Sequence, residues 1–360
     1  MLDEAMATMK TQVTWKTIVL PLIGIAAFIA YLQIFQVSIP EIIATIRQAD
    51  PLIYSLAALL VFVDVFFHSL AWHQLINFLS VKLSVLKSCL YVWYGIYVDI
   101  IIPAESLSGE ISRIYLVTRM HGNNVAGKVA ASLVAQRLIG MGIGTASLLI
   151  GMGMLMAEVQ VNGLIFNLTL FLVFATLFFA FLLLFLCIKK SWTLKIIDWV
   201  IRFIEYISRG KWKLAKIKEE AVKLADMFHV SIRAFGHTPK VVIVSIILTA
   251  LSWMAYLGIS YLCFLALNFK VSWSIIIMTQ AVVSAVKSIP LGVPFEVGLP
   301  EITMTTFYGL LGVPLGISAT ATILNRVLTL WLRFFVGFIA QQWIEIGIAR
   351  ASSNSVTLKG

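Results

Sequence analysis

Two breaks in otherwise apolar sequence bring acidic and basic residues close together. They read PAESLSGEISRIYL, residues 103 to 116, and PLGVPFEVGLPE, residues 290 to 301. The charged residues of these breaks are Glu105, Glu110 and Arg113 in the first and Glu296 and Glu301 in the second. An arginine in a protein-lined cavity can bind a phosphate through two parallel charge-assisted hydrogen bonds. The carboxylates could hold an arginine in place, bind a cationic group or take up protons, and the sequence leaves these three roles open.

Other residues could balance or explain these acids. The basic residues that lie within apolar sequence nearby are Arg137, Lys287, Arg326 and Arg333. Glu110 and Arg113 are three residues apart, so a helix would place them on one face. Glu301 follows Pro300, which suits the first position of a helix, and a carboxylate in the first turn complements the helix dipole. That role would account for Glu301 without any ligand.

Asp64 and His68 form a further polar pair, four residues apart on one face of a predicted helix. Ionisable residues inside a membrane segment are functional-site hypotheses by default, so the pair could relay protons. A buried polar pair between helices is the alternative. A metal site would need more ligands, and no Cys/His cluster supplies them. We therefore predict neither a metal nor a cofactor.

The composition places the chain among integral membrane proteins. Of its 360 residues, 60% are hydrophobic and 12% are charged, against about 45–50% apolar and about 25% charged in soluble domains. The three cysteines, Cys89, Cys187 and Cys263, are far apart and suggest neither a disulfide framework nor a zinc site. The glycines between 140 and 153 suit close helix packing.

Stretches of about 20 apolar residues are long enough to cross a bilayer as helices. Six of them predict full transmembrane helices near residues 16 to 35, 52 to 72, 128 to 156, 164 to 188, 240 to 266 and 314 to 345. Two more apolar segments are short, because 88 to 102 ends at Pro103 and 272 to 289 ends at Pro290.

Basic residues predict the orientation. Residues 189 to 240 contain twelve Lys/Arg and five Asp/Glu, and positively charged loops stay in the cytoplasm. We therefore expect a cell-membrane protein whose N- and C-termini and basic linker, residues 189 to 239, are cytoplasmic. The linker has two stretches with apolar residues at helical spacing, which suit the anionic surface of a membrane. Cytoplasmic orientation beside an anionic membrane is enough to explain the positive charge of the linker, so we predict no nucleic-acid partner.

The short segments fit this orientation only if they do not cross. We predict that 88 to 120 is a re-entrant hairpin entering from the cytoplasm and that 272 to 312 is one entering from outside. Broken backbone at membrane depth is tolerated where protein or a water-filled cavity covers it. The predicted fold is an all-α polytopic membrane protein with about six full transmembrane helices, two oppositely oriented re-entrant helical hairpins and an inverted-repeat-like arrangement. No residue-by-residue repeat is evident.

The predicted domain organisation is simple. One transmembrane domain spans residues 1 to 350, contains the linker, and is followed by a flexible tail at residues 351 to 360. That tail is too small for a soluble catalytic domain.

Short motifs in both halves resemble the lysylphosphatidylglycerol synthase transmembrane-region family of flippase-like membrane proteins. The motifs are Pro103, Gly109-Glu110, Arg113, Leu116 and Gln136-Arg137-Leu138, and then Pro290 to Glu301, Gly312-Val313-Pro314 and Asn325-Arg326. Gln136 stands where the family pattern expects glutamate, and Gly140 where it expects aspartate. The resemblance implies translocation of lipid between leaflets, with Arg137, Asn325 and Arg326 joining the acids and Arg113 in a substrate site.

Three functions follow from these observations. The preferred one is a stand-alone transporter, not an enzyme, that moves an anionic phospholipid or a polyprenyl-phosphate-type lipid through a cavity between the hairpins. The second is a membrane-embedded enzyme acting on lipid headgroups with Glu105 and Glu110 as acid and base. The third is a scaffold or accessory subunit for a lipid-modifying enzyme, recruited through the linker. A homodimer is possible, and no sequence feature decides it.

Overall fold

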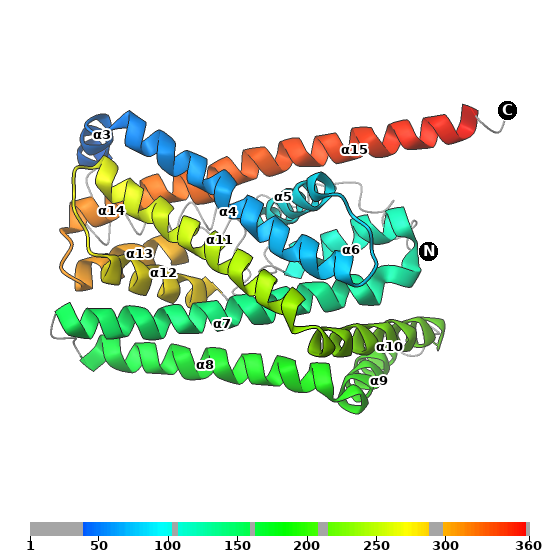
Figure 1. Ribbon diagram of the computed structural model, residues 1–360. Helices are drawn as coiled ribbons and strands as arrows, with labels where there is room; N and C mark the ends of the chain where they lie inside the picture. The colour runs from blue at the N-terminus through cyan, green and yellow to red at the C-terminus, as the bar shows by residue number, and fades with distance from the viewer. Residues whose placement is uncertain (1–38, 103–106, 159–162, 208–214, 288–297, 358–360) are drawn as a thin grey trace.

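The computed structural model describes residues 39–102, 107–158, 163–207, 215–287 and 298–357 (Figure 1). All regular elements within these ranges are helices, so the predicted all-α fold is confirmed. The helices lie roughly side by side as a bundle, with the short helices of the two predicted hairpins placed between longer ones (Figure 1).

Within the described ranges, five helical stretches are long and apolar enough to cross a membrane: Pro51–Phe78, Asn123–Glu158, Gly163–Ile188, Pro239–Ala266 and Leu315–Gly347. They correspond to five of the six predicted spans. The sixth, residues 16 to 35, lies outside the described residues. The protein is therefore a multi-pass membrane protein, because five apolar helices of this length have lipid as their matching solvent.

Two of the long helices, α4 (Pro51–Phe78) and α11 (Pro239–Ala266), cross each other in antiparallel directions. The backbone N–H of Asp50, at the start of α4, donates to the carbonyl of Ala266, at the end of α11, at 2.8 Å. The side chain of Asp50 also accepts from the N–H groups of Leu52 and Ile53 and so caps α4. A short helix, α3 (Ile39–Arg47), precedes this start.

The first predicted hairpin consists of α5 (Val85–Ile101) and α6 (Leu107–His121). Nε2 of His121 lies 3.3 Å from the carbonyl oxygen of Lys82, so the hairpin returns to the end of the bundle where it begins. A 3-10 turn, η1 (Asn123–Val125), then leads into α7 (Ala126–Glu158). The first hairpin thus belongs to the N-terminal end of α7.

The second hairpin consists of α12 (Trp273–Lys287) and α13 (Leu299–Leu310). Oγ of Ser274, in the first turn of α12, donates to Oε2 of Glu158, the last residue of α7, at 2.6 Å. The second hairpin therefore lies at the C-terminal end of α7, opposite to the first, as Figure 1 also shows. Both are helix pairs with the predicted positions, and their tips, residues 103–106 and 288–297, lie outside the described residues.

A continuous column of α14 (Leu315–Arg326), η3 (Val327–Leu332) and α15 (Arg333–Thr357) follows the second hairpin. The six residues of η3 form a π-helix. This geometry is rare overall, and where it occurs it is often at a functional site. α15 continues into the stretch predicted as a tail, residues 351 to 360, as far as Thr357.

Some glycines let helices approach closely, and others do not. A Cβ on Gly109 of α6 would lie 2.5 Å from the carbonyl oxygen of Gly95 on α5, and one on Gly151 of α7 would lie 3.0 Å from the backbone nitrogen of Met278 on α12. No described residue lies within 4 Å of the Cβ position at four other α7 glycines, so no described helix packs closely on them: Gly140, Gly142, Gly144 and Gly153.

The basic linker contains two helices after α8 (Gly163–Ile188), namely α9 (Lys190–Ile207) and α10 (Ala215–His237). Asp198 of α9 pairs with Arg202 at 2.5 Å and with Lys218 of α10. The hydrogen bond from Lys218 is the main reason that the pKa of Asp198 is lowered below its usual value. This exposed pair ties α9 to α10.

Candidate functional site

A first cluster of charged residues, Asp99, Glu110, Arg113 and Arg137, joins α5, α6 and α7. Nε of Arg137 donates to Oε1 of Glu110 at 3.0 Å, and the two side chains are 31% and 18% exposed. The pair therefore links α6 to α7 while both side chains remain partly accessible.

Arg113 is the more buried of the two arginines in this cluster, with 8% of its surface exposed. Its guanidinium lies 5.3 Å from the ring centroid of Trp72 on α4, and its Nε donates to the carbonyl of Gly109 at 3.4 Å. Nη1 of Arg113 has no hydrogen-bond partner among the described residues. A buried charged donor without an acceptor is costly, so this nitrogen is suited to receive an anion.

Asp99, near the end of α5, caps the start of α6 from across the hairpin. Its Oδ1 accepts from the backbone N–H of Gly109 at 2.6 Å and from Oγ of Ser108 at 2.6 Å. The first N–H groups of a helix have no partner within the helix, so this carboxylate satisfies one of them and complements the dipole. Asp99 thereby holds the first turn of α6, where Glu110 lies.

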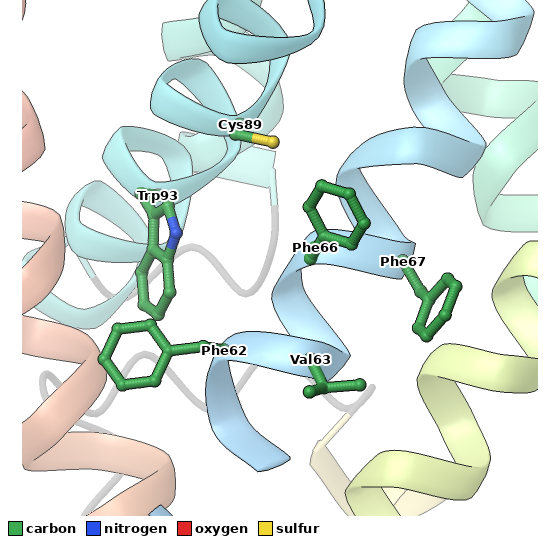
Figure 2. A pocket seen from close by; sticks show the side chains of 6 residues that line it. All are labelled: Phe62, Val63, Phe66, Phe67, Cys89 and Trp93. Atoms are coloured by element: carbon green, nitrogen blue, oxygen red, sulfur yellow. The ribbon is translucent and has the colours of Figure 1, made fainter. Parts of the chain in front are cut away.

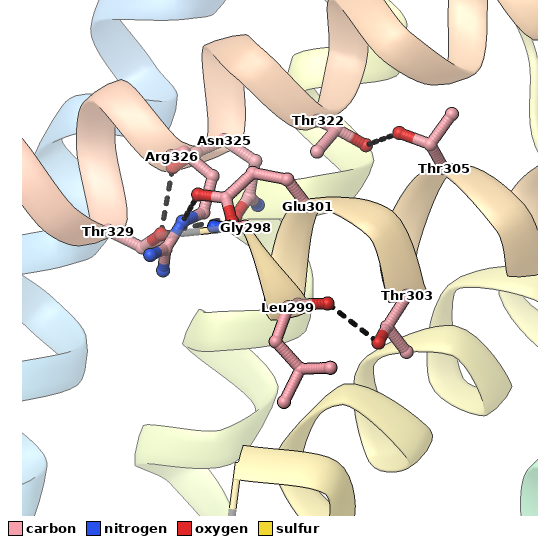
Figure 3. Close-up of polar contacts among 9 residues, drawn as sticks. All are labelled: Gly298, Leu299, Glu301, Thr303, Thr305, Thr322, Asn325, Arg326 and Thr329. Carbon is pink, nitrogen blue, oxygen red and sulfur yellow. Dashed lines mark hydrogen bonds and ion pairs between the residues drawn. The ribbon is translucent and has the colours of Figure 1, made fainter. Parts of the chain in front are cut away.

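A second cluster, Glu301, Asn325 and Arg326, joins α13 to α14 (Figure 3). Nε of Arg326 donates to Oε1 of Glu301 at 2.6 Å, and the two side chains are 9% and 4% exposed. The other carboxylate oxygen of Glu301 accepts from the N–H of Gly298 at 2.7 Å. Glu301 therefore has the helix-terminal role that its position suggested and also binds a buried arginine.

Asn325 anchors the second cluster to α11. Its Nδ2 donates to Oγ of Ser260 at 2.8 Å, and Oγ1 of Thr329 donates to its backbone carbonyl at 2.9 Å. Figure 3 shows that Asn325, Arg326 and Thr329 come from the same helical column and face the start of α13. The side chains of this cluster are thus held by three separate elements.

Asp64 precedes both clusters in the chain and pairs with residues of α11 and α15. Its Oδ1 accepts from Oγ of Ser252 at 2.5 Å, and its Oδ2 accepts from Arg333. The guanidinium of Arg333 also lies 5.7 Å from the ring centroid of Tyr256. Asp64 is therefore the acceptor at a junction of three long helices.

His68 has other contacts than Asp64. Nε2 of Gln136 donates to the backbone carbonyl of His68 at 2.9 Å and lies 3.3 Å from Nε2 of its ring. The described contacts thus connect Asp64 to Ser252 and Arg333, and His68 to Gln136, while the proton relay stays a prediction. Within the described ranges no group of three or more His, Cys, Asp or Glu residues is placed to hold a metal.

An apolar groove of about 510 Å³ lies between α4 and α5 (Figure 2). Its lining residues are all apolar or weakly polar: Phe62, Val63, Phe66, Phe67, Cys89 and Trp93. Phe62 and Trp93 pack with ring centroids 5.7 Å apart at one side of it. Such a lining suits hydrocarbon and offers nothing to a charged headgroup.

The structure brings most of the residues predicted for the site into these contacts. Glu110 pairs with Arg137, and Glu301 pairs with Arg326 beside Asn325, whereas Glu105 and Glu296 lie outside the described residues. Sequence reasoning missed Asp99, although an acid four residues before Pro103 in an apolar helix was a usable signal. It also missed Trp72, whose contact with Arg113 depends on how α4 packs.

Comparisons with known proteins agree with this architecture. The model of the family described as lysylphosphatidylglycerol synthase TM region matches residues 18–337. The chain is also similar to the UPF0104 membrane protein PH1989 of Pyrococcus horikoshii, with 20% identity over 328 residues that cover 88% of this chain and 95% of that protein. No solved structure matches the chain. Since the family model covers most of the chain, including both hairpins and both clusters, the protein belongs to the lysylphosphatidylglycerol synthase transmembrane-region family.

Proposed function

We propose that the protein moves an anionic lipid, a phospholipid or a polyprenyl phosphate, between the leaflets of the cell membrane. The observation that carries the proposal is Arg113, a buried arginine in a membrane protein whose Nη1 has no partner among the described residues. Ionisable residues in such positions mark substrate pathways. A phosphate oxygen is the acceptor that a guanidinium binds best, so a lipid phosphate suits this nitrogen.

The arrangement of the hairpins supports the same function. Each returns to its own end of the bundle, and the two ends are opposite. With the basic linker in the cytoplasm, the first hairpin is re-entrant from the cytoplasm and the second from outside. In transporters, interrupted segments in corresponding positions of two halves surround the substrate site near mid-membrane. The groove between α4 and α5 then gives lipid hydrocarbon a surface beside the first hairpin.

The alternatives have less support. The enzyme hypothesis needs Glu110 as an acid or base, but Glu110 already pairs with Arg137, and Glu105 lies outside the described residues. The scaffold hypothesis has one favourable observation, because α9 exposes the large apolar side chains of Trp192, Trp199 and Phe203. A cytoplasmic helix that follows a membrane span directly can place such a face in the lipid interface, which explains the exposure without a protein partner.

The test is movement of labelled phospholipids and polyprenyl phosphates across the bilayer of proteoliposomes. Arg113→Ala should slow movement by about tenfold or more, since a hydrogen bond to a charged group is worth about 1.5–3 kcal/mol. Glu301→Gln should also abolish movement, measured on the fraction of the variant that is folded. The matched control is Arg119→Ala, the same change six residues further along α6 at an exposed arginine that contacts Tyr115.

Each outcome decides between the hypotheses. Movement lost with Arg113→Ala and kept with Arg119→Ala supports a transporter whose site includes Arg113. Unchanged movement in the Arg113 variant would mean that the site lies elsewhere. The scaffold hypothesis replaces the transporter if two results are obtained together. Well-folded wild-type protein would move no lipid, and a variant lacking residues 190–237 would impair a lipid-modifying enzyme in cells.

A further inference from the structure

The two halves of the chain have the same order of elements. In the first half α4 is followed by the pair α5 and α6 and then by α7, and in the second α11 is followed by α12 and α13 and then by the column α14 to α15. α4 and α11 both have 28 residues and begin with proline. Their C-cap leucines, Leu79 and Leu267, are followed by Ser80 and Asn268, the two non-glycine residues with positive φ in the described ranges.

The charged pairs occupy corresponding places in the two halves. Glu110 lies in the first turn of α6 and pairs with an arginine 27 residues later, and Glu301 lies in the first turn of α13 and pairs with an arginine 25 residues later. In both pairs the arginine donates from Nε to Oε1, and an amide residue, Gln136 or Asn325, precedes it. The two pairs are therefore counterparts, which the sequence did not reveal.

The contacts between the halves are also reciprocal. Asp64 and Ser252 are each the fourteenth residue of their helix, α4 or α11, and they hydrogen-bond to each other. α12 of the second half packs on Gly151 of α7, and α5 of the first half packs on Gly337 of α15, where a Cβ would lie 2.7 Å from the carbonyl oxygen of Trp93. A two-fold axis between Asp64 and Ser252 accounts for these contacts, and it relates the halves in opposite orientations because α4 and α11 are antiparallel.

The Glu–Arg pairs of the two halves differ in the exposed fraction of their side chains. The Glu301–Arg326 pair is almost fully buried, whereas the Glu110–Arg137 pair is longer and partly exposed. Arg113, three residues after Glu110, has a nitrogen without a partner among the described residues, while its counterpart three residues after Glu301 is the buried Met304. The described structure is thus asymmetric, with the first cluster open and the second closed.

We infer that the two Glu–Arg pairs are quasi-equivalent half-sites for one anionic headgroup, and that translocation exchanges which half-site is open and which is closed. The inference rests on the proposed transport function, since a protein that moves no lipid has no use for two half-sites. Halves related by an axis in the membrane plane can adopt each other's conformation, which gives access from each side in turn. In the open half the headgroup phosphate binds Arg113 and Arg137, and in the closed half Glu301 takes the place of the headgroup on Arg326.

The test is hydrogen–deuterium exchange of α6 and α13 in nanodiscs of zwitterionic lipid, where no anionic cargo is present. Glu301→Gln weakens the closed pair, so exchange in residues 299–310 should rise while exchange in residues 107–121 falls. Glu110→Gln should do the reverse. We expect the exchange rates to change by at least about fivefold, which is the lower end of ordinary coupling between two sites. Coupling between two sites is reciprocal, so each substitution should affect the other half. The control is Asp198→Asn, which breaks an exposed pair outside both halves and should change neither region.

Reciprocal changes in the two regions support the inference. Exchange that rises only in the half carrying the substitution, or in both halves together, overturns it. Glu110→Gln keeps the test valid if Glu301→Gln does not fold, because the first pair is more exposed. Lipid movement without reciprocity contradicts this inference alone. Reciprocity without lipid movement contradicts the proposed function, and with it the assignment of the pairs as half-sites, and leaves only the coupling between the two pairs.

Discussion

Two buried arginines, Arg113 and Arg326, are held in different ways, and this difference is the main functional signal at the residue scale. Arg326 has a carboxylate at 2.6 Å, whereas Arg113 has an aromatic ring and a distant carbonyl. Breaking a buried ion pair leaves an uncompensated charge, while breaking an exposed pair costs little. The buried Glu301–Arg326 pair and the partly exposed Glu110–Arg137 pair should therefore differ in their contribution to stability.

We predict that Glu301→Ala destabilises the protein by about 3–5 kcal/mol, because Arg326 is left buried and unpaired. The matched Glu110→Ala should cost about 1 kcal/mol or less, since its pair with Arg137 is partly exposed. Thermal denaturation of detergent-solubilised protein measures both. The double variant Glu301→Leu, Arg326→Met should recover most of the loss, because apolar replacement of a whole buried pair is often neutral. Equal losses in the two single variants would contradict this assignment.

At the scale of elements, short helices that pack closely set the position of the charged residues. α5 has 17 residues and α6 has 15, and Asp99 joins them by capping α6. Gly95 and Gly109 allow the two backbones to approach, so the cap and the first turn of α6 reach each other. The same close packing places Arg113 against Gly95, where an added Cβ would lie 3.3 Å from Nε of Arg113, so the arginine would have to shift slightly.

Gly109→Ala should separate α5 from α6 and lower both stability and lipid movement. The added Cβ would lie 2.5 Å from the carbonyl oxygen of Gly95 and would also meet the Asp99 carboxylate. The matched control is Gly142→Ala, where no described residue lies within 4 Å of the added Cβ, and alanine there should stabilise α7 by up to about 1 kcal/mol through helix propensity. Thermal denaturation and lipid movement in proteoliposomes measure the two effects. A neutral Gly109 variant would show that the hairpin tolerates a wider separation.

At the scale of the whole molecule, the basic linker and the hairpins define two different ends. α9 and α10 lie at the end of α7 that carries the first hairpin, since Gly127 of α7 packs against the backbone of Leu224 on α10. The last residue of α7, Glu158, lies at the other end, with the second hairpin. From the positive charge of the linker we predict that its end is the cytoplasmic one.

This orientation predicts which side of the membrane each end faces. In a variant with Cys89, Cys187 and Cys263 replaced by alanine, a cysteine at Gly163 should react with an impermeant maleimide in intact cells. A cysteine at Glu219 of α10 should react only after the cells are permeabilised. Both positions are exposed, and Gly163 has open space around its Cβ position. The opposite pattern would invert the assigned topology, and labelling of both positions in intact cells would rule out a difference in sidedness.

The sequence by itself determined the membrane class, five of the long helices, the positions of both helix pairs and the charged residues at them. These follow from local properties: apolar length sets a span, and proline, glycine and charge mark where a helix ends. Only the tertiary structure decided which arginine binds which carboxylate, and that Asp64 binds Arg333, 269 residues away. It also revealed the correspondence between the halves, because a shared geometry needs only a few shared residues, such as Glu110 and Glu301, while most residues around them differ between the halves.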